Sequence, residues 1–275
     1  MSELFSYKGK RVAIVGCFSG MGEACARELV ELGAEVHGAD LKPSPVPLAS
    51  FTEVDLKDWS SIDQAVASIG GEVDALFNCA GLPQTFPAAD VVSVNFLGIR
   101  HWTEQWLPRM RPGGAIATIS SLGGMGFLGR IPLLQSLLAI TDKQEFLDWL
   151  AAHPDEVQDG YALSKELVNA WTCQLAYELG TMGIRVNATM PSPTQTPMMA
   201  AFENVVSKEI LNLFTIPSGR RSTPAEQGNP LILLNSDAAS FISGVCLPVD
   251  GGFHGGVQVG AINMQALLAD AAAGA

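Results

Sequence analysis

RVAIVGCFSGMG, residues 11–22, is the stretch that decides the fold. A short β-branched run ends in glycines at positions 16, 20 and 22, and an apolar helical pattern follows. Glycines at such a turn let backbone N–H groups and the helix N-terminus approach a phosphate closely. A glycine-rich turn can also be purely structural. Its place between a strand and a helix favours the binding of a dinucleotide pyrophosphate.

Outward from this turn, short β-branched runs alternate with helical segments. The expected strands are 11–16, 35–39, 51–54, 75–78, 115–120, 184–188 and 245–249, and the expected helices are 21–32, 60–69, 94–109, 160–182 and 224–234. Such alternation indicates βαβ units, right-handed crossovers and a parallel sheet covered on both faces. The sequence therefore predicts one α/β domain over residues 1–275, with a doubly wound parallel sheet of the Rossmann type.

Two long segments interrupt the alternation. Residues 122–159 form an insertion before a helix, and residues 190–223 begin with the turn PSPTQTP. Loops of this length usually serve function or carry small helices of their own. The tail, residues 253–275, is rich in glycine and alanine and has no assigned role.

Composition excludes several classes of partner. The 275 residues are 48% hydrophobic and carry a net charge of −12. Nucleic acid and anionic membrane surfaces demand clustered basic residues, so neither is expected as a partner. Five scattered cysteines without a CxxC pair indicate free thiols in a reducing compartment, and the first apolar run is too short for a signal peptide. We expect a cytoplasmic protein. The four histidines lack metal-ligand spacing, so no metal is expected.

An acidic residue follows the second expected strand. Asp40 lies eighteen residues after Gly22. A carboxylate there can accept hydrogen bonds from both adenine-ribose hydroxyls and repels a 2′-phosphate, although a loop or helix-capping aspartate is the alternative. No basic residue lies within residues 17–19 to receive a phosphate. The pattern favours NAD over NADP.

Tyr161 and Lys165 are four residues apart on an expected helix and so share one face. An ammonium about 4 Å from a phenol, at an effective dielectric of about 20, contributes roughly 4 kcal/mol, or about three pKa units. We therefore expect Lys165 to lower the pKa of Tyr161 toward working pH, where acid/base catalysis is effective. Such a pair also occurs by chance on exposed helices, so the neighbouring motifs decide whether Tyr161 and Lys165 are catalytic.

Those neighbours follow in a fixed order. They are GxxxGxG at 16–22, NCAG at 78–81, Asn95, the Ser120-Ser121 pair, YxxxK at 161–165 and PxxxxT at 191–196. Together they resemble the short-chain dehydrogenase/reductase family over about residues 11–252. The sequence departs from the family pattern at three positions: Val15 replaces the usual threonine, Cys79 an asparagine and Ser192 a glycine. None of these changes removes a catalytic group. The forty-residue spacing from Ser121 to Tyr161 resembles the bacterial 3α-hydroxysteroid dehydrogenase/carbonyl reductase branch.

The resemblance implies a role for each matching residue. The cofactor would be bound by Gly16, Ser19, Gly20, Met21 and Gly22 at the pyrophosphate, Asp40 at the adenosine ribose, Asp55 and Leu56 at the adenine, Asn78, Ala80 and Gly81 beside the ribose, Tyr161 and Lys165 at the nicotinamide ribose, and Pro191 and Thr196 at the nicotinamide end. The catalytic residues would be Asn95, holding a water in a proton relay to Lys165; Ser121, bonding the substrate oxygen; Tyr161, transferring the proton; and Lys165.

These roles imply an NAD-dependent oxidoreductase that interconverts a hydrophobic secondary alcohol and its ketone. The alternatives are an NAD-sensing protein without turnover and a nucleotide-sugar epimerase or dehydratase, which usually has a separate substrate domain. Residues 122–138 and 190–214 are expected to line an apolar pocket for a steroid, terpenoid or aryl-alkyl compound. The expected lining residues are Met125, Phe127, Leu128, Ile131, Leu134, Met190, Met198, Met199, Phe202 and Phe214.

The insertion also bears on assembly. In much of the family the helix that carries the tyrosine packs against another subunit to give a tetramer. An insertion next to this helix would cover that surface and leave a homodimer through residues 224–234 and 245–249. The alternative is a surface lobe that leaves the tetramer intact.

Overall fold

A single parallel sheet forms the centre of the computed structural model, which describes residues 3–267. Its seven strands run in the order β3-β2-β1-β4-β5-β6-β7, and every neighbouring pair is parallel. The strands are β1 (Arg11–Val15), β2 (Glu35–Asp40), β3 (Ser50–Glu53), β4 (Val73–Asn78), β5 (Met110–Ile119), β6 (Arg185–Pro191) and β7 (Cys246–Val249). The predicted doubly wound Rossmann-type sheet is confirmed.

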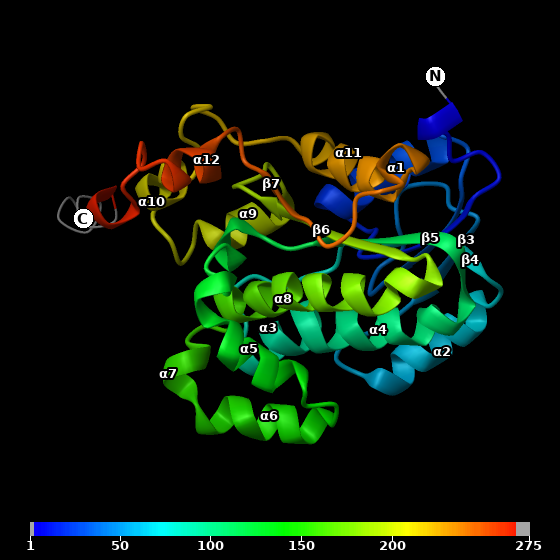
Figure 1. The fold of residues 1–275 in the computed structure, drawn as a ribbon, viewed down its shortest axis with the longest axis horizontal. Helices are drawn as coiled ribbons and strands as arrows, with labels where there is room; N and C mark the ends of the chain where they lie inside the picture. The colour runs from blue at the N-terminus through cyan, green and yellow to red at the C-terminus, as the bar shows by residue number, and fades with distance from the viewer. Residues whose placement is uncertain (1–2, 268–275) are drawn as a thin grey trace.

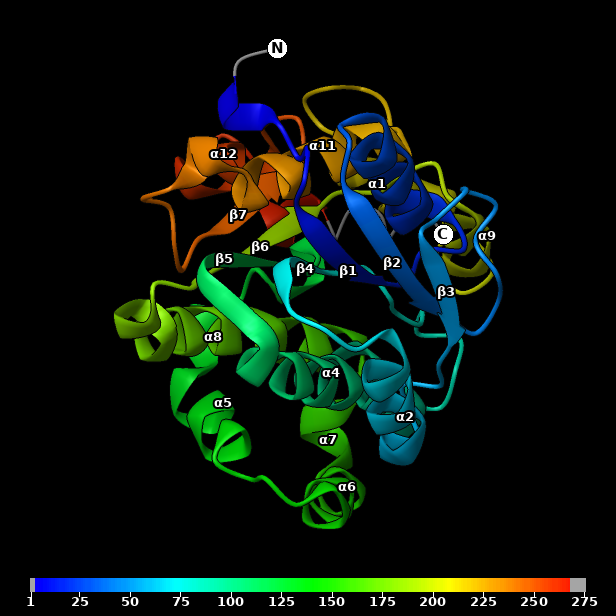
Figure 2. The same ribbon diagram turned by 90° about the vertical axis from the view of Figure 1, so that its right-hand side faces the viewer.

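Helices cover both faces of the sheet (Figures 1 and 2). One face carries α1 (Gly20–Glu31) and α11 (Pro224–Asn235), which pack against each other. The other face carries α2 (Trp59–Ile69), α3 (Ala88–Val92), α4 (Ile99–Trp106) and α8 (Tyr161–Leu179). Central strands read as continuous apolar runs because both of their faces are buried, as in Val12 to Val15.

The helical region between β4 and β5 differs from the predicted single helix over residues 94–109. The chain is already helical from Ala88, and a π-helical segment, Ser93–Gly98, separates α3 from α4. A π segment inside a helix often marks a functional site. Strand β5 also begins earlier than residue 115, because Met110 pairs with Val73 beyond an irregularity in the register. The other predicted elements agree to within about two residues at most ends.

The insertion folds into a third layer of helices. It contains α5 (Ile131–Leu138), α6 (Lys143–Ala152) and α7 (Pro154–Val157), which lie on the outer side of α8 and α3 (Figure 1). The guanidinium of Arg130 joins this layer to α8 by bonding Glu166 (2.6 Å) and Glu156 (2.7 Å). The prediction that a segment of this length carries its own helices is confirmed.

The second long segment carries two short helices at one end of the molecule (Figure 1). These are α9 (Pro197–Phe202) and α10 (Lys208–Leu213), and the chain after β7 adds α12 (Phe253–Gln258) beside them. The rings of Phe214 and Phe253 lie 5.3 Å apart, so the start of the tail supports this segment. Residues 268–275 of the tail lie outside the described residues. Within residues 3–267, no helix has the length and apolar character needed to cross a bilayer.

Candidate active site

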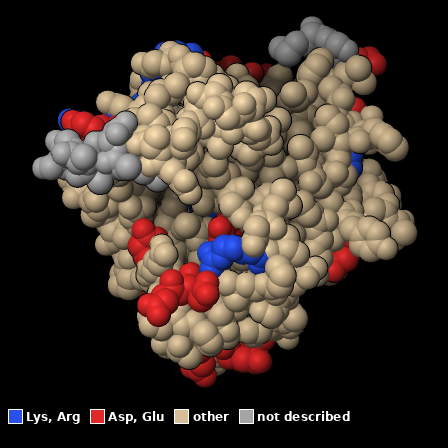
Figure 3. Space-filling model, turned by 60° about the vertical axis from the view of Figure 1, so that its left-hand side comes forward, with Lys and Arg blue, Asp and Glu red and all other residues tan. Residues whose placement is uncertain are grey.

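A cavity of about 400 Å³ opens at the carboxyl edge of the sheet. Ligands bind at this edge in open α/β sheets, where the loops after the strands converge. The walls come from the turn after β1, the loop after β4, the end of β5, the start of α8 and the segment after β6. Figure 3 turns toward this side of the molecule, where uncharged residues predominate.

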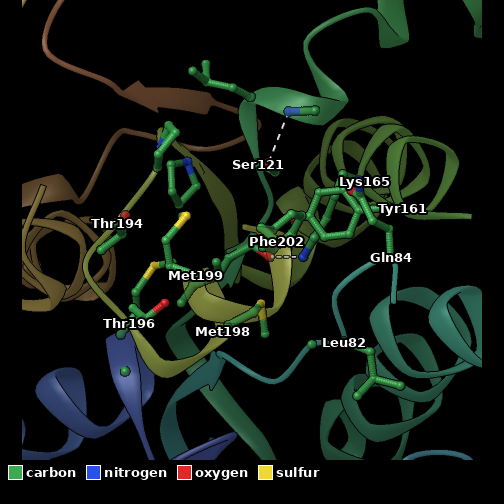
Figure 4. Close-up of a pocket in the computed structure, with 18 of the residues that line it drawn as sticks. Leu82, Gln84, Ser121, Tyr161, Lys165, Thr194, Thr196, Met198, Met199 and Phe202 are labelled. Carbon is green, nitrogen blue, oxygen red and sulfur yellow. Dashed lines mark hydrogen bonds between the residues drawn. The ribbon is translucent and has the colours of Figure 1, made fainter. Parts of the chain in front are cut away.

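Eleven of the predicted site residues line this one cavity. They are Ser19, Gly20, Met21, Gly22, Ala80, Gly81, Ser121, Tyr161, Lys165, Pro191 and Thr196. Figure 4 shows how the loop after β6 brings Thr196 opposite the side that carries Tyr161 and Lys165. These residues are far apart in the sequence but close in space, because the parallel strands that precede them end at the same edge of the sheet.

The glycine-rich turn is built so that backbone approaches backbone. Gly16 has a φ of +87°, and a Cβ there would lie 2.3 Å from the nitrogen of Ala80. A Cβ on Gly22 would lie 1.9 Å from the carbonyl oxygen of Gly16. Both positions therefore require glycine. The turn leaves Ser19 to Gly22 on the cavity wall at the N-terminus of α1, a geometry that suits an anionic pyrophosphate.

Two serines end β5, and only the second is free to donate into the cavity. The Ser120 hydroxyl donates to the carbonyl of Lys165 at 3.2 Å and is buried. The Ser121 hydroxyl accepts a hydrogen bond from the N–H of Gly123 at 3.0 Å, which leaves its own hydrogen to donate. This geometry supports the choice of Ser121 over Ser120 as the residue that bonds a substrate oxygen.

Tyr161 and Lys165 lie together, but their electrostatics differ from the expectation. The ammonium of Lys165 lies 5.8 Å from the centre of the Tyr161 ring and donates to the carbonyl of Ile119 at 3.0 Å. Burial raises the pKa of Tyr161, with the Ser121 hydroxyl acting in the opposite direction. Burial lowers the pKa of Lys165 to about 8. The expected lowering of the Tyr161 pKa is wrong for this structure, because burial is the largest effect and Lys165 is not among the groups that shift this pKa.

The two predicted asparagines are buried behind the cavity wall. Asn78 donates to the hydroxyls of Thr103 and Thr118, so it ties β4 to α4 and β5. Asn95 lies in the π-helical segment, accepts from the N–H of Leu82 at 2.6 Å and donates to its carbonyl and to Ser164. Asn95 therefore fixes the loop that lines the cavity after Gly81. Its place in a proton relay stays a prediction.

Three predicted cofactor residues lie on the same sheet edge but outside the cavity lining. The carboxylate of Asp40 ends β2 and accepts from the N–H of Phe18 at 3.0 Å. Asp55 accepts from the N–H of Lys57, and the Leu56 side chain belongs to the core. Near Asp40, the ammonium of Lys42 lies over the ring of Phe18 at 5.4 Å and adds a basic group close to that carboxylate.

The apolar wall comes mainly from one of the two segments that were expected to supply it. Met198, Met199, Phe202 and Phe214 line the cavity as predicted. Phe202 packs edge-on against the Tyr161 ring, with ring centres 5.1 Å apart. The predicted lining by Met125, Phe127, Leu128, Ile131, Leu134 and Met190 is wrong.

Those six residues have other environments, and Met125 is half-buried outside the cavity lining. Phe127 and Leu134 are buried in the main core, Ile131 packs against that core, Met190 is buried beside Phe253, and Leu128 is exposed. The inserted helices use their apolar residues to pack on α8, so little is left for the cavity. Of residues 122–138, only Leu122 and Gly123 line it.

Several lining residues were not named from the sequence, although four of them lie within residues 190–214, which were expected to line the pocket. They include Leu82 and Gln84 after β4, Gln158 and Asp159 at the end of the insertion, and Thr194, Val206, Ile210 and Leu211 in the segment after β6. Leu82 and Gln84 follow the NCAG motif directly, so their proximity to that turn was the one available hint.

Comparison with known proteins identifies the family. A family model described as short chain dehydrogenase matches residues 10–132, and one described as enoyl-(acyl carrier protein) reductase matches residues 151–254. The chain is 30% identical over 244 residues to a coniferyl-alcohol dehydrogenase from Pseudomonas sp. strain HR199, covering 88% of this chain and 96% of that protein. This chain belongs to the short-chain dehydrogenase family.

Other short-chain dehydrogenases show the same extent of likeness. A 3-alpha-hydroxysteroid dehydrogenase/carbonyl reductase from Comamonas testosteroni is 30% identical, with 88% of this chain and 95% of that protein covered. The crystal structure of the 3-alpha-hydroxysteroid dehydrogenase from Pseudomonas sp. B-0831 complexed with NADH superposes with a TM-score of 0.78 at 28% identity. It covers 92% of this chain and all of that one. The short-chain dehydrogenase fold therefore extends over nearly the whole chain.

Proposed function

We propose that the protein is an NAD-dependent oxidoreductase that interconverts a hydrophobic secondary alcohol and its ketone. One observation carries the proposal: Ser121, Tyr161 and Lys165 line the same cavity as the glycine-rich turn and an apolar wall. Binding residues for a dinucleotide and a proton-transferring phenol are needed together only if chemistry occurs at their junction. A protein that merely senses NAD has no need of all these groups.

The proposed mechanism assigns one task to each polar residue. When bound, a nicotinamide ring would exchange a hydride with the carbinol carbon of the substrate. Ser121 donates a hydrogen bond to the substrate oxygen and holds it beside Tyr161. The Tyr161 hydroxyl gives a proton to that oxygen in ketone reduction and becomes a phenolate, and in alcohol oxidation the phenolate takes the proton from the alcohol. Burial raises the pKa of this phenol above its ordinary value of 10.0 and so favours the neutral form, which is the form needed as an acid.

The substrate class follows from the wall that faces Tyr161. Met198, Met199 and Phe202 are apolar, and no lysine or arginine other than Lys165 is among the described residues that line the cavity. Such a surface favours a neutral, apolar substrate. Relatives named for coniferyl alcohol and for 3-alpha-hydroxysteroids are consistent with a ring-containing alcohol.

The preference for NAD is proposed to rest on Asp40. Asp40→Ala removes a carboxylate that repels a 2′-phosphate, and Lys42 nearby can then attract the phosphate. We expect the ratio of kcat/KM for NAD to that for NADP to fall by at least tenfold. Adding Lys42→Met to Asp40→Ala should reverse part of this change. Equal use of both cofactors by the parent would contradict the role of Asp40.

A turnover assay tests the proposed function. The purified protein is given NAD and a panel of steroid, terpenoid and aryl-alkyl secondary alcohols, and the absorbance of the reduced nicotinamide is followed. We expect turnover of at least one ring-containing alcohol, and the matching ketone should be reduced in the reverse direction. Tight NAD binding without turnover across the panel would instead indicate a sensing protein.

A further inference from the structure

The insertion ends in a turn whose backbone is strained at one residue. Gln158, directly after α7, has φ 51° and ψ −121°, a conformation suited to glycine. Among residues 3–267 it is the one residue other than glycine with a positive φ. Such strain costs on the order of 1–3 kcal/mol and persists only where the surroundings hold it.

The contacts around Gln158 show what holds it. Its N–H donates to the carbonyl of Pro154 at 2.8 Å, which closes the turn. Gly160 follows with φ +78°, and a Cβ there would lie 2.6 Å from the carbonyl oxygen of Ala88. The carboxylate of Asp159 accepts from the N–H of Tyr161 at 2.9 Å. The turn is thus fixed between α7, α3 and the start of α8, and it presents Gln158 to the cavity.

A second glutamine, from another loop, lines the same cavity. Gln84 comes from the loop after β4 and is partly buried (Figure 4). Within residues 3–267, neither the Gln84 nor the Gln158 side chain has a hydrogen-bond partner, whereas the Thr194 hydroxyl is bonded to Ser192 and Ser222. Each free amide offers two N–H donors and one carbonyl acceptor. Gln84 is half-buried and Gln158 is exposed, so both amides are free to hydrogen-bond a polar group of a ligand in the cavity.

We propose that Gln84 and Gln158 bind a second oxygen function of the substrate, so that the substrate class is a neutral, apolar molecule with two oxygen groups. One is the alcohol or ketone that reacts at Tyr161, and the other is a separate hydroxyl or carbonyl of the same molecule. Amides suit a neutral oxygen because they both donate and accept. The carboxylate of Asp159 on the same wall disfavours a carboxylate or phosphate. This inference rests on the proposed function.

The test compares matched substrates and matched variants. The substrates are 2-decalol and decalin-2,6-diol, which share one skeleton and differ in the second hydroxyl. The parent should show a higher kcat/KM for the diol, through a lower KM. Gln158→Gly and Gln84→Met should each lower the diol-to-monool ratio by about fivefold to tenfold, the effect of one neutral hydrogen bond. Gln135→Met, an exposed glutamine in α5, is the control and should leave the ratio unchanged.

Stability separates a binding role from a structural one. Glycine adopts the backbone conformation of residue 158 without strain, so Gln158→Gly should raise the melting temperature while it lowers the diol preference. An unchanged ratio, or a variant less stable than the parent, would overturn the inference and leave the proposed function standing. Absence of turnover of both substrates and of the wider alcohol panel would count against the proposed function itself, and the inference would fall with it.

Discussion

At the scale of single residues, burial shifts the pKa values of Tyr161 and Lys165 in opposite directions. Lys165 is buried and donates to the Ile119 carbonyl, and no carboxylate of residues 3–267 forms an ion pair with it. Its pKa falls from an ordinary value of 10.5 to about 8. The folded state therefore holds the proton less tightly than the unfolded chain, and the charged form of Lys165 costs stability below pH 8.

We predict that Lys165→Met stabilises the protein at pH 7. The shift corresponds to at most about 3 kcal/mol, less the lost hydrogen bond to Ile119. The advantage should shrink between pH 8 and 10.5, because the lysine becomes neutral in both states. Urea unfolding at several pH values measures it, with the exposed Lys208→Met as the control. A variant destabilised at pH 7 would show that Lys165 is better compensated than its contacts indicate.

The sequence predicts the place of a residue where a motif marks it, but not where the property depends on tertiary packing. The motifs located Ser121, Tyr161 and Thr196 in the cavity because their spacing is tied to strand ends. The pKa of Tyr161 was predicted in the wrong direction, because sequence spacing carries no information on burial. Gln158 gave no signal at all, since its strained backbone depends on contacts with Pro154 and Ala88.

At the scale of elements, Arg130 adds an ionic link to the apolar packing between the insertion and α8. Arg130 is partly buried and bonds Glu166 on α8, whose side chain is 8% exposed. Burial raises the pKa of Glu166, and the Arg130 guanidinium acts against this. The length of the insertion predicted helices, but not that its apolar residues would pack on α8 rather than line the cavity. That choice depends on which face of α8 is left uncovered by the sheet.

We predict that Arg130→Gln destabilises the protein by about 1–3 kcal/mol at pH 7, because a buried carboxylate loses its partner. A folded-state pKa raised further above the unfolded value makes stability fall as pH rises through it, so the deficit should be larger at pH 7 than at pH 4.5. Denaturant unfolding at both values tests this. The exposed pair of Arg27 and Glu23 is the control, and Arg27→Gln should cost little. A deficit independent of pH would contradict the ionic role of Glu166.

At the scale of the whole molecule, the third layer of helices changes which surfaces are open. The inserted helices lie outside α8 and α3, whereas α11 and the edge strand β7 are not covered by them (Figures 1 and 2). The parallel sheet and its order followed from the alternation of strands and helices along the chain. The surfaces that stay uncovered could not be predicted from this alternation, because they depend on where the insertion packs.

We predict a homodimer that uses α11 and β7. Leu233 on α11 is 40% exposed, and Leu233→Glu should convert the dimer into a monomer. Leu128→Glu changes a 73% exposed residue of the insertion and serves as the matched control that should stay dimeric. Light scattering gives the mass of each. A tetramer, or an assembly that Leu128→Glu splits, would contradict this arrangement.

The central claim is that Tyr161 transfers the proton in an NAD-dependent alcohol oxidation, and Tyr161→Phe tests it most directly. The change removes one hydroxyl and keeps the ring that packs on Phe202. Alcohol-dependent formation of reduced nicotinamide and NAD affinity are measured on the same preparations of parent and variant. We predict a loss of turnover of at least about 100-fold, the usual scale for a positioned acid/base, with NAD affinity nearly unchanged. Residual activity well above about one hundredth of the parent's would contradict the claim.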